Sequence, residues 1–266
     1  MSLRFWAIVI LIIAAAGAAL TLSSSNKPSK ATLAAERTGA SAAPPSVVSD
    51  VTSVPTSTLD SIGQGLANVY PKPISAPALT EEGKPEVFYQ GAEYCPYCAT
   101  ERWAMAVSLA RFGTFTNLKV THSSTSDVYP NTQTLSFYGS TYKSSYITFT
   151  PVEIYTNIAS ESGGYTTLQT LNNAQQNLVD KYNTSGGIPF VDLGGKYVLV
   201  SASYNPQTLT GSSWQKIASS LANPRTLIAQ GVDGAANTIT AAICKLTNNQ
   251  PGNVCDPVIQ SLEARL

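Results

Sequence analysis

The sequence predicts an α/β domain preceded by an N-terminal transmembrane helix, and three observations support this fold class. A β-prone run over Glu86–Gln90 leads directly into Cys95-Pro96-Tyr97-Cys98 and then into a helical stretch. A second β-prone segment, residues 186–201, contains a Gly-Gly turn and predicts a β-hairpin. Near the N-terminus, residues 5–22 form an uncharged, largely apolar run. Strands that alternate with helices are typical of a layered α/β fold.

The N-terminal run predicts either a retained transmembrane anchor or a cleaved signal peptide. Residues 5–22 are close to the lower limit for crossing a hydrocarbon core of ~30 Å, and their length favours the anchor. The small residues of Ala14–Ala19 would also suit a signal peptidase. The flanking basic residues give a mixed orientation signal. We expect the domain on the extracytoplasmic side of the membrane, because two cysteine pairs suit an oxidising compartment.

The segment between the N-terminal run and the domain predicts a tether. Residues 23–80 are rich in Pro, Ser, Thr and Ala, a composition that buries little apolar surface and favours an extended or mobile chain. One short helix is expected within Leu59–Val69. The domain organisation is therefore an anchor or signal over 1–22, a tether over 23–80 and a domain over 81–266 that is long enough for one core.

The motif Cys95-Pro96-Tyr97-Cys98 predicts thiol–disulfide chemistry. The helix that follows it is expected to end near Gly113. A cysteine at a helix N-terminus faces unpaired backbone N–H groups and the positive end of the helix dipole, which favour the nucleophilic thiolate. Cys95 is therefore expected to attack, and Cys98, one turn further along, to resolve the mixed disulfide. Pro96 suits the first helical turn, where no amide proton is needed.

Two other interpretations of the motif remain open. Cys-x-x-Cys is also half of a zinc site, but the only further candidates, His122, Cys244 and Cys255, fit no common zinc spacing. No metal site and no cofactor are therefore expected. A purely structural disulfide between Cys95 and Cys98 is the second alternative.

The remaining elements of the domain follow from periodicity and turn signals. Strands are expected over Leu118–His122 and Ser145–Ile154, separated by a polar, tyrosine-rich stretch at residues 123–146. A helix is expected over Thr166–Tyr182, where leucines recur at helical spacing. Three C-terminal helices are expected over Trp214–Leu221, Pro224–Gly231 and Ala235–Leu246.

Cys244 and Cys255 predict a structural disulfide across the polar loop 248–253. Closing a loop of this size stabilises a fold by roughly 3 kcal/mol in the chain-entropy account. A second redox pair that exchanges electrons with Cys95 and Cys98 is the alternative.

Charge and histidine content exclude several functions. The formal net charge is zero, with 16 basic and 16 acidic residues, and no basic stretch suggests nucleic-acid binding. The single histidine, His122, lies in a β-prone run without a nucleophile motif beside it, which argues against a Ser–His or Cys–His hydrolase.

The stretch Gly83–Ala104, together with Arg111–Phe115 and the Gly-Ile-Pro-Phe-Val-Asp segment at 187–192, resembles the domain-of-unknown-function 929 family. The resemblance covers about residues 80–266 and implies one N-terminal hydrophobic segment and a thioredoxin-like three-layer sandwich, here with helical insertions or extensions. A wider similarity to thioredoxin-like oxidoreductases implies that Cys95 is the nucleophile, Cys98 the resolver and Pro189 a cis loop proline.

In such folds the backbone of Ile188 would pair with a substrate strand, so that Ile188, Pro189, Pro96 and Tyr97 are the expected substrate-binding residues. One departure concerns the proton acceptor. Thioredoxins carry a buried acid six residues before the first cysteine, and this chain has Tyr89 there. Glu93 and Glu101 lie nearer in sequence, with simple solvation of either as the alternative to a role at the site, so the proton-acceptor role is unassigned.

The function expected from the sequence is a membrane-tethered, extracytoplasmic thiol–disulfide oxidoreductase. It would act on cysteines of exported proteins, with a membrane redox partner as a further possibility. The alternative is a non-catalytic thioredoxin-like binding or scaffold module stapled by two structural disulfides. Accessibility and a depressed pKa at Cys95 would favour the first over the second.

Overall fold

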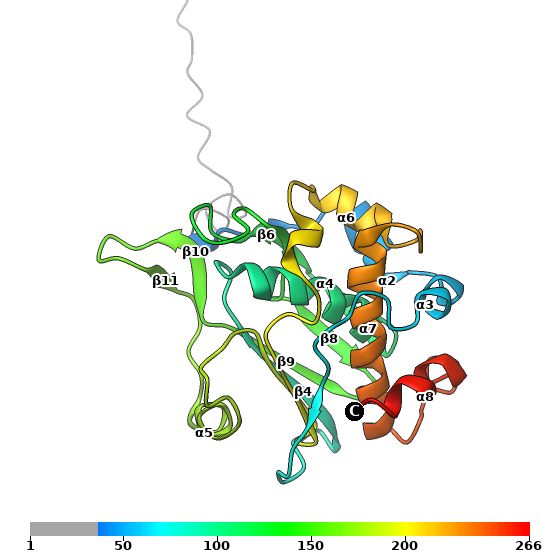
Figure 1. Cartoon of the computed structure of the whole chain (residues 1–266). Coiled ribbons are helices and arrows are strands. Elements are labelled where there is room, and N and C mark those ends of the chain that lie inside the picture. The colour runs from blue at the N-terminus through cyan, green and yellow to red at the C-terminus, as the bar shows by residue number, and fades with distance from the viewer. Residues whose placement is uncertain (1–36) are drawn as a thin grey trace, which may run out of the picture.

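In this computed structural model the chain is described over residues 37–266. A mixed β-sheet carries helices α4 (Pro96–Ala110) and α7 (Leu227–Leu246) on one face and α5 (Asn173–Tyr182) on the other (Figure 1). The α/β class predicted from the sequence is confirmed. Alternation along β4 explains the two faces: Val87 and Tyr89 join the core with α4 and α7, whereas Phe88 packs with α5.

The central strand β4 (Lys84–Gly91) pairs in parallel with β9 (Thr148–Glu153) and antiparallel with β12 (Phe190–Leu193). β12 in turn pairs antiparallel with β13 (Tyr197–Val200), and this is the hairpin that the Gly-Gly turn predicts. The order is therefore β13, β12, β4, β9, with the short strands β2 (Lys72–Pro73) and β3 (Thr80–Glu81) paired to β13 and β4.

Shorter ladders lie beside this sheet. The predicted strand over Leu118–His122 is present as β6 (Lys119–His122), but it pairs with β1 (Ser41–Ala42) and β7 (Gln133–Ser136) in a separate sheet. β5 (Gly113–Thr116) pairs with β8 (Thr141–Ser144). β10 (Tyr155–Ala159) and β11 (Tyr165–Thr167) form a hairpin that projects from the body in Figure 1.

Two helix predictions need correction. The helix expected over Thr166–Tyr182 begins only at Asn173, because Asn172 and Gln175 form a capping box there; Thr166 and Thr167 belong to β11. The two helices expected over Pro224–Gly231 and Ala235–Leu246 are one continuous helix, α7. α6 (Trp214–Ser220) matches its prediction, and α8 (Pro257–Glu263) was not predicted.

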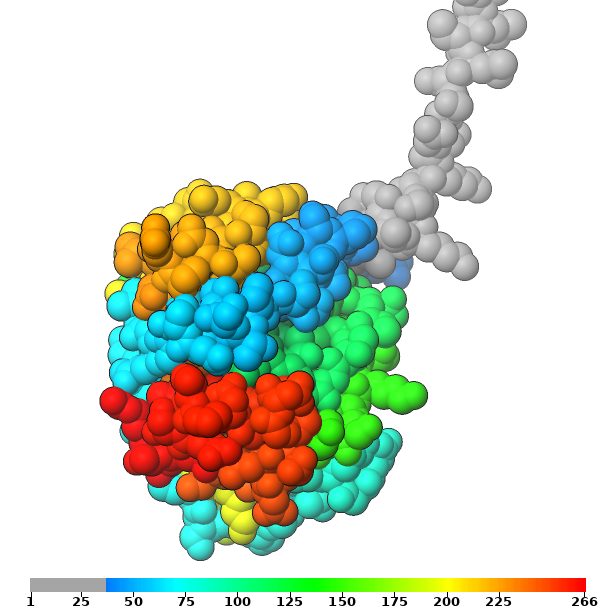
Figure 2. Space-filling model, turned by 90° about the vertical axis from the view of Figure 1, so that its right-hand side faces the viewer, coloured from blue at the N-terminus to red at the C-terminus, as the bar shows by residue number. Residues whose placement is uncertain are grey.

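The expectation of a mobile tether over 23–80 is wrong for its central part. Residues 45–62 form α2 (Pro45–Thr52) and α3 (Thr56–Ile62), so the short helix expected within Leu59–Val69 lies earlier than predicted. Val47, Val51 and Leu59 are buried in the main core. Figure 2 shows the blue-to-cyan segment lying against the body between the gold and red C-terminal parts.

The predicted N-terminal anchor or signal over residues 5–22 lies outside the described residues. Between residues 37 and 266, no helix combines the length and apolar character needed to cross a membrane.

Candidate functional site

The two cysteines of the motif meet where β4 ends and α4 begins. Cys95 is the N-cap of α4, and its Sγ accepts a hydrogen bond from the Cys98 amide at 3.4 Å. Pro96 occupies the first helical turn, as expected, and is itself buried. Both thiols are free; Cys95 is 6% exposed and Cys98 is fully buried. Of the two sulfurs, that of Cys95 is therefore the one that a substrate can reach.

The pKa values of the two thiols are shifted in opposite directions. The pKa of Cys95 is lowered, chiefly because the Cys98 side chain hydrogen-bonds to it and also because the amides of Cys98 and Tyr97 point at its sulfur. Burial raises the pKa of Cys98 well above its ordinary value. A thiolate forms more easily at the outer sulfur than at the inner one, and the thiolate is the nucleophile. The arrangement suits Cys95 for attack.

The loop before β12 lies directly over Cys95. The Ile188–Pro189 peptide bond is cis, as the sequence resemblance implies. The Ile188 carbonyl oxygen is 3.8 Å from the Cys95 sulfur, and the Ile188 side chain packs on the small cluster formed by Ala92, Cys95 and Cys98. Of the expected substrate-binding residues, Ile188 and Tyr97 are half-buried beside the sulfur, whereas Pro96 and Pro189 are buried.

A fully buried ion cluster lies beneath the motif, and no sequence motif indicated most of its members. Arg102, on the second turn of α4, binds Glu153 at the end of β9 through two hydrogen bonds of 2.7 and 2.8 Å. Its Nη2 also donates to the Ala92 carbonyl at 2.8 Å and lies 3.3 Å from a carboxylate oxygen of Glu93. Ser136 donates a short hydrogen bond to the other oxygen of Glu93.

The two glutamates near the motif, for which solvation is the open alternative from the sequence, are both buried. Burial raises the pKa of Glu93 to about 8 and that of Glu101 to about 7. Glu101 accepts hydrogen bonds from the amide and hydroxyl of Ser203 at 2.7 and 2.9 Å, so its role is to hold the chain after β13. Glu93 is the better candidate for holding a proton in the ion cluster, because it shares Arg102 with Glu153 and Arg102 also acts on Cys98.

Tyr89 lies on β4, six residues before Cys95, where the resemblance to thioredoxins leads one to expect an acid. Its ring packs edge-on against Phe137 at 5.4 Å, and its hydroxyl lies over Gly91, where a side chain would collide with it. Within residues 37–266 neither this hydroxyl nor Nη1 of Arg102 has a hydrogen-bond partner. Burial raises the pKa of Tyr89 well above its ordinary value, so it stays neutral and cannot replace a carboxylate.

The second cysteine pair is a disulfide. Cys244 near the end of α7 bonds Cys255 before α8, with the two Cα atoms 5.6 Å apart, and both residues are buried in the main core. The bond ties the C-terminal helix to α7, as the structural prediction has it. Across the described part of the chain, no group of three or more His, Cys, Asp and Glu side chains is arranged to hold a metal ion.

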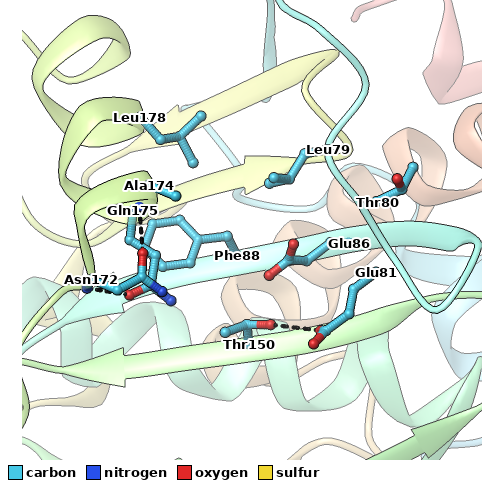
Figure 3. Close-up of a pocket in the computed structure, with 10 residues that line it drawn as sticks. All are labelled: Leu79, Thr80, Glu81, Glu86, Phe88, Thr150, Asn172, Ala174, Gln175 and Leu178. Carbon is cyan, nitrogen blue, oxygen red and sulfur yellow. Dashed lines mark hydrogen bonds between the residues drawn. The ribbon is translucent and has the colours of Figure 1, made fainter.

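A cavity of about 400 Å³ lies on the α5 face of the sheet, away from the cysteines. Figure 3 shows Phe88 on its floor, Leu178 of α5 on one side and the Glu81 and Glu86 carboxylates near Thr150 on another. Because Phe88 faces α5 whereas α4 covers the other face, this cavity does not belong to the cysteine site.

Together these features define a class: a mixed α/β protein with a free cysteine pair whose first member caps a buried helix above an ion cluster. The chain belongs to the family described as Domain of unknown function (DUF929), whose profile matches residues 70–245. The family predicted from residues 83–104 is thus confirmed. No curated protein and no solved structure matches the chain.

Proposed function

We propose that this protein is a thiol–disulfide oxidoreductase with a thioredoxin-like fold that acts on protein cysteines through Cys95 and Cys98. The observation that carries the proposal is the asymmetry of the pair, in which the pKa of Cys95 is lowered by hydrogen bonding at the α4 N-cap. A strand–CxxC–helix corner, a parallel β4–β9 crossover and a hairpin preceded by a cis proline support the fold assignment.

The chemistry is a balanced two-electron exchange. The Cys95 thiolate attacks one sulfur of a substrate disulfide, a Cys95–substrate bond forms, and the second substrate sulfur leaves as a thiolate that takes up a proton. The Cys98 thiol then loses its proton and attacks the Cys95 sulfur. The substrate leaves as a second thiol, and Cys95 and Cys98 become a disulfide. The reverse sequence oxidises a dithiol substrate.

The proton released by Cys98 needs an acceptor. Glu93 is the candidate, because it contacts Arg102, whose charge also acts on Cys98, and in its ionised form, populated increasingly as the pH approaches its pKa of about 8, it can accept a proton. Glu153, paired with Arg102 through two hydrogen bonds, keeps the charge of the cluster balanced when Glu93 is protonated.

We assign the site of action to the outer side of a membrane. The uncharged run over residues 5–22 and the intramolecular Cys244–Cys255 disulfide support an exported domain, because disulfides persist in oxidising compartments. The substrates would be exported proteins with cysteines, and a membrane redox partner would reset the pair.

A redox titration tests the proposal. The full-length chain is equilibrated in glutathione buffers of known potential, and alkylation of each cysteine is followed by mass spectrometry. We expect a reversible Cys95–Cys98 couple between roughly −120 and −270 mV, and a Cys98→Ala variant that accumulates mixed disulfides at Cys95. The Cys244–Cys255 bond provides the internal control, because a structural disulfide should stay oxidised across this range.

The alternative is a binding module in which Cys95 and Cys98 form a structural staple. A pair that remains oxidised below roughly −300 mV, with no mixed disulfide trapped by Cys98→Ala, would establish that alternative and rule out the exchange cycle. The same titration gives the direction of electron flow, since a less negative potential indicates an oxidant and a more negative one a reductant.

A further inference from the structure

Tyr94 and Tyr97, which pack against the cluster that contains Cys95, each line a cavity, and further tyrosines line both cavities. The first, here named the hairpin cavity, has a volume of about 250 Å³ and lies between Tyr94 and the β10–β11 hairpin, with Tyr155, Tyr165, Gly163 and Gly164 as its other walls. The second, about 270 Å³, has Tyr97, Tyr129 and Tyr204 among its lining residues. Tyr94, directly before the motif, and Tyr97, within it, therefore each line one cavity.

The hairpin cavity has firmly placed aromatic walls. The Tyr94 ring stacks on the Tyr165 ring with centroids 4.1 Å apart and an interplanar angle of 6°, and Tyr155 lies 6.2 Å from Tyr94. The Tyr165 hydroxyl donates to the Ser124 hydroxyl at 2.6 Å, which fixes the ring from the opposite side. Tyr155 is 37% exposed, so its ring is available to a ligand.

The backbone holds this wall close to the reactive sulfur. The Ile154 amide donates to the Gly91 carbonyl at 2.8 Å, and the Glu93 amide donates to the Tyr155 carbonyl at 2.9 Å. These two bonds continue the pairing of β4 and β9 up to the residues just before Cys95. The position of Tyr155 is therefore tied to the segment that carries the nucleophile, although the rest of the hairpin projects outward (Figure 1).

The lack of charged side chains among the described residues that line the two cavities indicates which class of substrate the cavities suit. Among the described residues no acidic or basic side chain lines either cavity. Arg102, the cation nearest the motif in the chain, is fully buried and bound to Glu153. Asp127 acts on Tyr94 as a negative charge. A small acidic thiol such as glutathione, with two carboxylates and one ammonium group, finds no cation here, whereas an uncharged aromatic or apolar side chain finds tyrosine faces.

We infer that the hairpin cavity recognises an aromatic or large apolar side chain beside the cysteine of a polypeptide substrate. The inference rests on the proposed thiol–disulfide exchange at Cys95 and names its substrate class: extended, uncharged polypeptide rather than glutathione. Tyr155 and Tyr165 are then specificity residues that touch the substrate side chain next to its reacting cysteine, while the chemistry stays at Cys95.

The test uses the full-length Cys98→Ala protein, in which attack by Cys95 stops at the mixed disulfide. The probes are two short neutral peptides that differ only in Phe or Ala next to their cysteine, each joined through a disulfide to a thionitrobenzoate group. Release of the coloured thiolate reports the rate of attack. We expect the Phe peptide to react about 10-fold faster than the Ala peptide, which is typical of one apolar side chain in a pocket.

Tyrosine variants locate the preference. In the same background, Tyr155→Ala and Tyr165→Ala should bring the Phe-to-Ala rate ratio close to about 1, whereas Tyr165→Phe, which keeps the stacked ring, should preserve most of it. Tyr138→Ala is the matched control, because Tyr138 packs on Lys119 and lines neither cavity. Using a ratio of two peptides removes any effect of the variants on the nucleophile itself.

The outcomes separate the inference from the proposed function. If neither peptide nor a small aromatic disulfide reacts with Cys98→Ala, the exchange function itself fails, and the inference fails with it. If the small disulfide reacts but the two peptides react equally, or the preference survives in Tyr155→Ala and Tyr165→Ala, the hairpin cavity is not the specificity site although the function stands. Faster attack on glutathione disulfide than on the Phe peptide would also overturn the inference.

Discussion

Asp233 lies within α7, fully buried, and neither of its carboxylate oxygens has a hydrogen-bond partner among residues 37–266. Burial alone raises its pKa to about 8 from an ordinary value of 3.8. A buried carboxylate without a partner is costly, so the folded protein keeps this group protonated near neutral pH. Because the unfolded chain releases the proton near pH 4, the free energy of unfolding falls as pH rises between about 4 and 8.

The variant Asp233→Asn tests this dependence, because asparagine is a neutral group of the same shape. Its stability relative to the parent should rise by up to ~1.4 kcal/mol for each pH unit between about 4 and 8, and level off above that. Below pH 4 the parent is protonated in both states and the gain should vanish. Urea unfolding at a series of pH values measures the difference, and Asp180→Asn, at an exposed position of α5, is the matched control. A difference that stays constant with pH would show that Asp233 is charged in the folded state.

The ion cluster under the motif shows which site residues can be assigned from the sequence and which cannot. Cys95, Cys98 and Pro189 were found because a short motif or a local turn carries their signal. Arg102 and Glu153 are far apart in the chain and are joined only when α4 and β9 pack, so no spacing rule could pair them. For Glu93 and Glu101 the sequence left solvation open, because glutamate is rarely buried and the partners that hold them in the interior come from other elements.

The long helix α7 also shows that contacts between distant segments cannot be predicted from local sequence. The sequence divided it near Gly231 and Gly234, because glycine is a weak helix former. In the structure both glycines are required by close contacts: a Cβ on Gly231 would lie 2.7 Å from the Tyr204 ring, and one on Gly234 would lie 2.3 Å from the Gln64 carbonyl oxygen. The glycines allow a loop and a ring to touch the helix, and the helix continues through them.

The variant Gly234→Ala is therefore expected to destabilise the protein, although alanine favours a helix. The obstructing atom belongs to the backbone at Gln64, which cannot rotate away as a side chain can. Crowding of this kind costs ~1–3 kcal/mol, more than the gain in helix propensity of ~1 kcal/mol. Urea unfolding gives the loss. Gly252→Ala serves as the control, since its added carbon meets open space. An equally or more stable Gly234→Ala would mean that the loop at Gln64 yields easily.

At the scale of the whole molecule, the local units of the fold were predictable and their assembly was not. The β4–α4 corner and the β12–β13 hairpin each lie within a short stretch of sequence with strong turn or cap signals. The prolines of the N-terminal segment led to the wrong prediction of a tether over residues 45–62. Pro45 and Pro55 lie at the starts of α2 and α3 rather than in a mobile spacer. Proline is favoured at the first turn of a helix as well as in tethers, and only packing decides between the two.

That packing predicts that the folded unit extends to the N-terminal side of the family-matched region 70–245. α2 and α3 bury Val47, Val51 and Leu59 in the main core. The Asn237 side chain on α7 donates to the carbonyls of Leu59 and Gly63 at 2.8 Å each. A chain that begins at residue 70 loses these apolar contacts and leaves the Asn237 amide without its partners, which is costly in a buried place.

Urea unfolding of chains covering residues 37–266 and 70–266 tests the extent of the unit. We expect the shorter chain to unfold at a markedly lower urea concentration or to lose its cooperative transition, because it exposes apolar surface of α4, α6 and α7. Leu59→Ala in the longer chain separates packing from length and should cost ~2–5 kcal/mol. Equal midpoints and slopes for the two chains would mean that α2 and α3 rest on a core that is complete without them. In that case the spacer interpretation would return, with residues 45–62 as a segment that docks on the domain but does not help it fold.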